Sequence, residues 1–93
     1  MHLLGIEVSF HFYYVESLKE KRRIMRSIID HVQSRYRITA AEVDYLDSLE
    51  RGAIGFGVVS NSRKQAEKVL QKVINHIDIQ SEIEIIHIDW IEA

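Results

Sequence analysis

The sequence contains no cysteine and no proline, and only four of its 93 residues are glycine. Without cysteine the chain cannot form a disulfide, use a thiol as a nucleophile or hold a metal through thiolates. Without proline or a stretch rich in serine and glycine, it lacks the composition of a linker between domains. No apolar run reaches the roughly 18 residues of a membrane-spanning helix, and residues 1–10 lack the pattern of a signal peptide. These absences predict a single domain over residues 1–93, in the cytoplasm and away from membranes.

Charge is distributed unevenly along the chain. The sequence has twelve Lys and Arg and fourteen Asp and Glu, which give a net charge of −2. Seven of the basic residues, but only two of the acidic ones, fall between Ser17 and Arg37. Such an asymmetry is typical of a binding surface and says little about catalysis.

Two segments have the apolar periodicity of an amphipathic helix. The first runs from Ser17 towards Arg37, and its apolar stripe comprises Leu18, Met25, Ile28, Ile29, Val32 and Tyr36. The second begins at Ser62, and its stripe comprises Ala66, Val69, Leu70, Val73, Ile74 and Ile77. Each start has the spacing of a capping box, Ser17 with Glu20 and Ser62 with Gln65.

Four segments alternate in the manner of strands, namely Leu4–Phe12, Thr39–Tyr45, Ala53–Ser60 and Glu82–Ile91. The last segment changes phase, because Ile83 and Ile85 share one register while Ile86, Ile88 and Trp90 share the other. A β-bulge near Ile85–Ile86 would reconcile the two registers, and so would a strand that is covered on both faces. We favour the bulge.

The predicted order of elements is βαββαβ. Each βαβ crossover is expected to be right-handed, and a hairpin around Leu46–Glu50 joins the two middle strands. With both helices on one face, this order predicts an α+β ferredoxin-like sandwich. Its four-stranded antiparallel sheet would have the spatial order 4-1-3-2.

Three motifs relate the chain to a known family: SLKEKRR at residues 17–23, AEVD at residues 41–44 and GVVSN at residues 57–61. With these motifs the chain resembles the YlxP-like family of small bacterial proteins, which has no assigned function. The resemblance extends from Leu4 to Ile91. It implies a ferredoxin-like fold, a tendency to self-associate, and genes near those of a translation initiation factor and a ribosome-binding factor. The family offers no catalytic residues to transfer.

The exposed side of the first helix is a candidate nucleic-acid-binding surface. In a helical projection Lys19, Arg23 and Arg26 lie opposite the apolar stripe, and Arg37 falls near the same direction beyond the helix end. Cations grouped in this way attract a phosphate backbone. The alternative is a solvated helix face that only keeps the protein soluble.

Two further cations of this helix point less clearly to solvent. Lys21 falls within the apolar arc and Arg22 at its flank. In the predicted fold the helix begins at the end of the sheet that carries the acidic hairpin. We therefore predict a structural ion pair in which Lys21, Arg22 or both reach Asp44 or its neighbours.

The start of the second helix is a candidate anion-binding site, formed by Ser60, Asn61, Ser62 and Arg63. Free amide groups at a helix N-terminus, together with hydroxyls and a cation, suit an anion. The alternative is simple capping by Asn and Ser, which many helices show.

No motif indicates catalysis or a cofactor. His87 and Asp89 share one face of a strand, but two ligands are too few for a metal site. Gly55 and Gly57 lack a third glycine at the dinucleotide-binding spacing. No nucleophile-elbow motif is present. We therefore expect a non-enzymatic protein with no catalytic residue, metal or cofactor.

The sheet face away from the helices is predicted to carry small side chains, namely Gly5, Ser9, Ala40, Ala53, Gly55 and Gly57. RNA-recognition motifs use exposed aromatic residues on this face, which the central strands here lack. Small residues instead let a second sheet approach closely. Such a contact would be bordered by Leu3, Val59 and part of the set Ile83, Ile85 and Ile91. We expect a homodimer through this face or through an edge strand.

The sequence thus predicts a non-enzymatic, homo-oligomeric binding protein that associates with RNA or the ribosome through its basic first helix. One alternative is a regulatory domain that binds a small ligand at a dimer interface, as ferredoxin-like sensor domains do. Another is a structural module that binds only other proteins.

Overall fold

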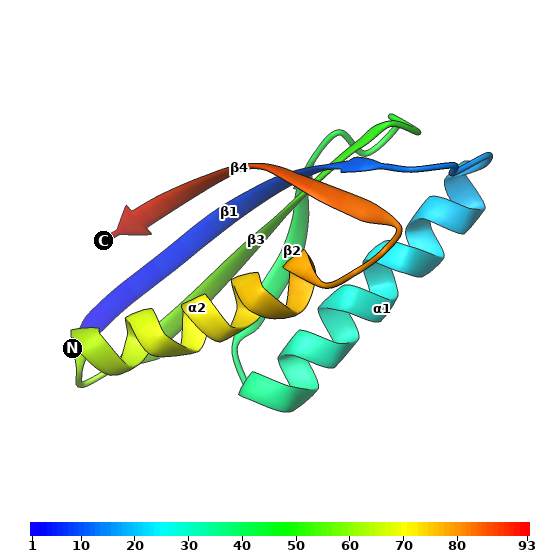
Figure 1. Cartoon of the computed structure of the whole chain (residues 1–93). Coiled ribbons are helices and arrows are strands. Elements are labelled where there is room, and N and C mark those ends of the chain that lie inside the picture. The colour runs from blue at the N-terminus through cyan, green and yellow to red at the C-terminus, as the bar shows by residue number, and fades with distance from the viewer.

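The computed structural model describes residues 1–93 and contains the six predicted elements in the predicted order. The strands are β1 (His2–Phe12), β2 (Thr39–Asp44), β3 (Arg51–Ser60) and β4 (Ile83–Glu92), and the helices are α1 (Leu18–Tyr36) and α2 (Arg63–Asp78). The strands form one antiparallel sheet in the order β2-β3-β1-β4, and both helices cover the same face of it (Figure 1). The predicted ferredoxin-like sandwich and its strand order are confirmed.

Serine side chains cap both helices where the sequence predicts them. The hydroxyl oxygen of Ser17 accepts a hydrogen bond from the backbone N–H of Glu20 at 3.1 Å. The hydroxyl of Ser62 accepts one from the N–H of Gln65 at 3.2 Å. These bonds satisfy amide groups that have no partner inside the helix, so the sequence defines where each helix begins.

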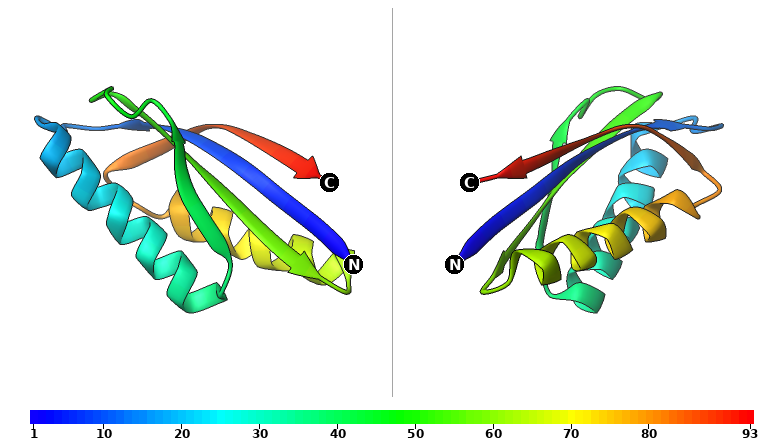
Figure 2. Two further views of the ribbon diagram at one scale, coloured as in Figure 1. Left: turned by 180° about the vertical axis from the view of Figure 1, so that it is seen from behind. Right: turned by 60° about the vertical axis from the view of Figure 1, so that its left-hand side comes forward.

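The hydrophobic core lies between the sheet and the helices. Alternate residues of β1 point into it and are at most 3% exposed: Leu4, Ile6, Val8, Phe10 and Phe12. The apolar stripes of α1 and α2 cover them from one side, and the other face of the sheet remains open (Figure 2). We call the uncovered side the open face.

A β-bulge interrupts the pairing of β4 with β1. Ser9 pairs with His87 and the next residue, Phe10, pairs with Ile85, so Ile86 has no partner. The predicted bulge is confirmed. The bulge places Ile83 and Ile85 on the helix side, where Ile83 is buried and Ile85 packs against the core. Of the three isoleucines from which we expected part of the border of the open face, only Ile91 lies there, since it pairs with Gly5.

Ala40 also lies on the side opposite to the predicted one. It pairs with Phe56 of β3, a core residue, and packs against the core itself. Directly paired residues of an antiparallel sheet share a face, so Ala40 must point to the helices. The weak alternation of this strand in the sequence left its phase poorly defined.

Two histidine rings join the helices at the surface. His31 of α1 and His76 of α2 stack with their ring centroids 4.0 Å apart and their planes 10° from parallel. Burial lowers the pKa of His76, and the nearby His31 lowers this pKa further. The folded protein therefore favours the neutral form of His76.

This pair predicts a pH dependence of stability. The pKa of His76 is lower in the folded state than in the unfolded state, so the unfolded chain binds more protons as the pH falls. We expect the free energy of unfolding to decrease from about pH 8 to pH 5, around the ordinary histidine pKa. Urea titrations at several pH values should show that the free energy of unfolding of His76→Gln falls less steeply with decreasing pH than that of the unmodified protein. The slope for His31→Gln should lie between the two. Equal slopes for the three proteins would contradict this assignment.

Candidate functional site

The N-terminal half of α1 carries an exposed hollow that is lined only by polar residues. Its volume is about 650 Å³, and its lining consists of Ser17, Lys19, Glu20, Arg22, Arg23 and Arg26. None of the four cations forms an ion pair within the chain. We call this feature the α1 hollow. It presents four free positive charges and one carboxylate to solvent.

The structure brings together three of the four residues predicted to bind nucleic acid, namely Lys19, Arg23 and Arg26. Arg37 does not join them. It is the C-terminal cap of α1, eleven residues beyond Arg26, and a helix rises about 1.5 Å per residue. Roughly 16 Å along the axis thus separates it from the hollow. Sequence reasoning left out Arg22, which lines the hollow from the flank of the apolar arc.

Lys21 points inward and ties α1 to the β2–β3 hairpin. Its side chain is 1% exposed, and its ammonium group donates a hydrogen bond to the carbonyl oxygen of Tyr45 at 2.5 Å. The ammonium nitrogen also lies 3.9 Å from a carboxylate oxygen of Glu42 and 5.7 Å from the centroid of the Phe12 ring. Burial lowers the pKa of Lys21, and the charge of Glu42 opposes this effect.

The predicted tie is present, because Lys21 reaches two neighbours of Asp44, namely Glu42 and Tyr45, although Asp44 itself is not its partner. The carboxylate of Asp44 accepts a hydrogen bond from the backbone N–H of Tyr45 at 2.7 Å. Tyr45 adopts a left-handed backbone conformation with a φ of 59°, and its carbonyl oxygen is the acceptor that Lys21 reaches. Of the two candidate cations Lys21 alone makes the tie, since Arg22 is exposed and forms no ion pair.

Lys21→Met should lower the free energy of unfolding by about 1–3 kcal/mol, because the Tyr45 carbonyl and Glu42 lose their buried donor. Arg22→Met is the matched control, since the same change at an exposed, unpaired cation should cost less than about 0.5 kcal/mol. Urea denaturation followed by circular dichroism measures both. A similar loss in the two variants would mean that Lys21 does not tie the helix to the hairpin.

Three of the four residues of the predicted anion site, Ser60, Ser62 and Arg63, are engaged within the chain. The hydroxyl of Ser60 accepts a hydrogen bond from the N–H of Ser62 at 3.0 Å, and the hydroxyl of Ser62 caps α2. Arg63 donates to the two carboxylate oxygens of Glu92 at 3.1 and 2.9 Å and pairs with Glu67. Arg63 lowers the pKa of Glu92 through this hydrogen bond. The structure therefore supports the capping alternative, and it does not assemble Arg63 with Ser60, Asn61 and Ser62 around a free anion.

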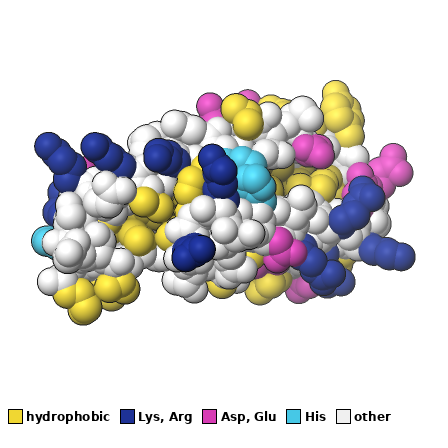
Figure 3. Space-filling model, turned by 90° about the horizontal axis from the view of Figure 1, so that it is seen from below, with side chains coloured by type: hydrophobic (Ala, Val, Ile, Leu, Met, Phe, Trp, Pro, Cys, Tyr) yellow, Lys and Arg dark blue, Asp and Glu magenta, His cyan; other side chains and the backbone are white.

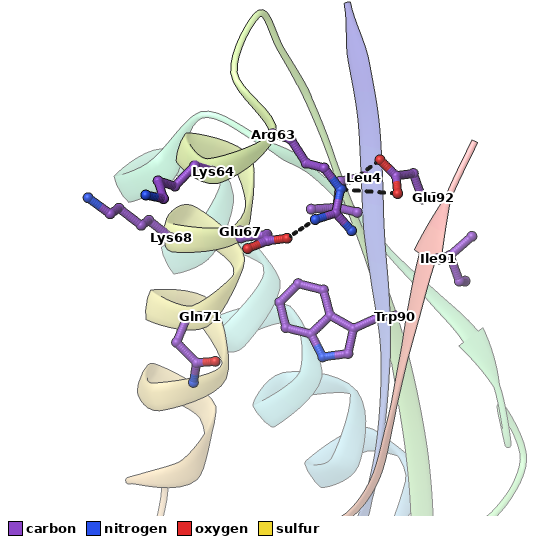
Figure 4. Close-up of a pocket in the computed structure, with 9 residues that line it drawn as sticks. All are labelled: Leu4, Arg63, Lys64, Glu67, Lys68, Gln71, Trp90, Ile91 and Glu92. Carbon is purple, nitrogen blue, oxygen red and sulfur yellow. Dashed lines mark hydrogen bonds and ion pairs between the residues drawn. The ribbon is translucent and has the colours of Figure 1, made fainter.

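A second hollow lies between the start of α2 and the end of β4 (Figure 4). Its volume is about 760 Å³, and it is lined by Leu4, Arg63, Lys64, Glu67, Lys68, Gln71, Trp90, Ile91 and Glu92. Trp90 is 47% exposed and extends from β4 towards α2. We call this second hollow the α2–β4 groove. Sequence reasoning missed it, and the only signal was an isolated tryptophan in a strand far from the basic start of α2.

The open face has a shallow apolar hollow of about 370 Å³. Gly5, Gly55 and Gly57 lie in its floor, and Leu3, Val43 and Ile91 border it. A Cβ atom on Gly5 would lie 2.9 Å from the carbonyl oxygen of Phe56, so this position excludes any side chain without a backbone shift. The predicted surface of small residues is therefore present at Gly5, Gly55 and Gly57, whereas Ala53, which pairs with Ser9, is fully buried.

The structure contains no group of three or more His, Asp or Glu residues placed to hold a metal ion. His87 and Asp89 form a hydrogen-bonded pair at 2.8 Å on the exposed edge strand. Neither helix combines the length and the apolar character needed to span a membrane.

Three comparisons relate this geometry to known proteins. A family model described as "Protein of unknown function (DUF503)" matches residues 4–90. The uncharacterized protein YlxP of Bacillus subtilis (strain 168) is 42% identical over 72 residues, which cover 77% of this chain and 78% of that protein. An amidase of the hydantoinase/carbamoylase family from Burkholderia phymatum matches with a TM-score of 0.54 and 10% sequence identity. That match covers 99% of this chain but only 28% of the amidase chain, and at such low identity it shows a shared fold alone.

Proposed function

The chain belongs to the DUF503 family of proteins of unknown function, and we propose that it binds RNA. In this proposal the protein is a non-enzymatic homo-oligomer of the bacterial cytoplasm. It associates with RNA, including ribosomal RNA, through the α1 hollow. The observation that carries the proposal is the group of four exposed cations there that have no acidic partner within the chain.

Phosphate chemistry fits the α1 hollow. The guanidinium groups of Arg22, Arg23 and Arg26 can each donate two parallel hydrogen bonds to a phosphate. The hollow also adjoins the N-terminus of α1, where the helix dipole favours an anion. That same dipole disfavours cations, so a bound phosphate would relieve a repulsion that the free protein retains.

Salt dependence distinguishes RNA binding from the binding of a neutral small ligand. Each single-strand phosphate contact contributes about −0.7 to the log–log slope of affinity against salt concentration. The double variant Arg23→Glu/Arg26→Glu should weaken binding of a labelled single-stranded RNA by about tenfold or more. It should also make the slope less steep by about 1.4. Fluorescence anisotropy at several salt concentrations gives both quantities.

The matched control is Arg35→Glu/Arg37→Glu, which makes the same charge change on the C-terminal part of the same helix, outside the hollow. We expect it to retain most of the affinity. Equal losses in the two double variants would point to non-specific attraction by net charge. Affinity that does not respond to salt would contradict the proposal and favour the regulatory alternative.

Self-association through the open face completes the proposal. Leu3, Val43, Val59 and Ile91 are apolar and between 42% and 62% exposed on that side. The glycine floor between them allows a second sheet to approach closely. A two-fold axis through this face would let the same patch pair with itself, as most homodimers do.

Val59→Glu/Ile91→Glu should convert the dimer to a monomer, because two charges per subunit would be buried in the contact. Ile79→Glu is the control, since Ile79 is 77% exposed at the end of α2 and lies outside the open face. Light scattering after size-exclusion chromatography, at several protein concentrations, measures the mass. A monomeric unmodified protein, or a control that dissociates equally, would refute an open-face dimer.

A further inference from the structure

Aromatic side chains gather where β1 ends and the chain turns towards α1. His11 alternates with the buried Phe10 and Phe12, so it lies on the open face. The ring of Tyr13 meets that of His11 edge to face with their centroids 5.5 Å apart, and the centroid of the Tyr14 ring lies 6.3 Å from that of Tyr13. Tyr13 is 38% exposed and Tyr14 is 94% exposed. We call His11, Tyr13 and Tyr14 the β1 aromatic cluster.

Tyr14 has a backbone conformation that is costly for a residue with a large side chain. Its φ is 56°, in the left-handed region, which residues other than glycine, asparagine and aspartate seldom occupy. Its ring is exposed and packs against no residue of the core, so burial does not offset this cost. Backbone strain that the packing of the chain does not require is typical of residues that contact a ligand or a partner.

The charged residues beside the cluster leave a cation free. Arg51 of β3 pairs with His11, so the two side chains share the open face. Arg51 is exposed and forms no ion pair, and its guanidinium carbon lies 5.9 Å from the centroid of the Tyr45 ring. On the other side of β1, Glu84 pairs with His11, and a hydrogen bond to Glu84 raises the pKa of Tyr13. The guanidinium is therefore available to a ligand, while this carboxylate is engaged.

The β1 aromatic cluster and the α1 hollow lie at the same end of the molecule. Tyr14 precedes Ser17, which lines the hollow, by three residues, so their Cα atoms are at most about 11 Å apart. Lys21 of α1 donates its hydrogen bond to Tyr45, in the hairpin that leads to Arg51. Where α1 begins, Lys and Arg side chains gather on the helix-bearing face and hydrophobic side chains project beside them (Figure 3).

We propose that the β1 aromatic cluster stacks the bases of single-stranded RNA, while Arg51 and the cations of the α1 hollow hold its phosphates. This inference rests on the RNA association proposed above and adds which form of RNA is bound. Aromatic rings stack on unpaired bases of any sequence, whereas a duplex keeps its bases paired and leaves the exposed Tyr14 ring unused. A second copy of the chain fits this end less well, because a two-fold contact here would bring the cations of both copies together.

The test compares a fluorescently labelled single-stranded deca-adenylate with a labelled RNA duplex, using anisotropy. Tyr14→Asn removes the ring and suits the left-handed backbone, so the variant should be as stable as the unmodified protein in urea denaturation. It should weaken binding of the single strand by about fivefold to a hundredfold, as expected for one lost stacking contact. Affinity for the duplex should change by less than about twofold. Tyr14→Phe should retain most of the single-strand affinity, because Phe keeps a stacking face.

Salt dependence separates stacking from phosphate contacts. Tyr14→Asn should leave the log–log slope of affinity against salt concentration unchanged, because the ring carries no charge, whereas Arg23→Glu/Arg26→Glu makes that slope less steep. Trp90→Leu is the matched control, since it also removes an exposed aromatic ring. Trp90 pairs with Ile6, six residues before Phe12, and therefore lies about 20 Å along β1 from the cluster. This variant should bind within about twofold of the unmodified protein.

Several results would overturn the proposal. Single-strand binding that stays within twofold in Tyr14→Asn would refute stacking and leave the RNA association of the α1 hollow in place, whereas an unmodified protein that binds neither RNA would refute both. Equal losses in Tyr14→Asn and Trp90→Leu would show that the cluster has no specific role. A loss of stability in Tyr14→Asn would assign the ring to the fold. A lower mass of this variant in light scattering would assign the ring to a contact with a second copy.

Discussion

The strict alternation of β1 is the constraint on which the rest of the structure depends. This strand pairs with β3 on one side and with β4 on the other, so its register fixes the faces of both neighbours. One set of its residues is buried under the helices, and the other set, which includes Gly5, Glu7 and Ser9, lies on the open face. A shift of one residue would exchange the two sets. A Cβ atom at position 5 would lie 2.9 Å from the Phe56 carbonyl oxygen, so a shift that brought a larger residue there would require the backbone to move.

Local periodicity was sufficient to predict the elements and their assembly. The two helices and their serine caps follow from spacings within each segment, and the strand order follows from the βαββαβ sequence of elements. The alternation of β1 is so regular that only one of its faces can be buried. The errors occur where the face of the sheet to which a residue points depends on how its strand pairs with a neighbour. Ile83 and Ile85 turn inward because the bulge falls at Ile86, and Ala40 turns inward because it pairs with Phe56. The phase change within the last strand predicted the bulge but not which face Ile83 and Ile85 would share, and the weak alternation of β2 left the face of Ala40 undefined.

The candidate sites show the same contrast between features that one segment defines and features that depend on contacts in the folded chain. A helical projection places Lys19, Arg23 and Arg26 together correctly, but it ignores the rise along the axis and so included Arg37. The partner of Lys21 was missed because a backbone carbonyl, presented by the left-handed turn at Tyr45, carries no sequence signal. The α2–β4 groove joins residues from two elements that meet only in the folded chain.

Lys21 connects the stability of the fold to the direction of the free cations. Successive helical residues are about 100° apart, so anchoring Lys21 to the hairpin turns Arg23 to the opposite side of α1. Burial disfavours the charge of Lys21, and the short hydrogen bond to Tyr45 together with Glu42 offsets that effect. An apolar residue would fill the same space without this cost of desolvation. What the lysine adds is a directional bond that sets the rotation of α1, and that rotation presents Arg22, Arg23 and Arg26 to solvent as one group.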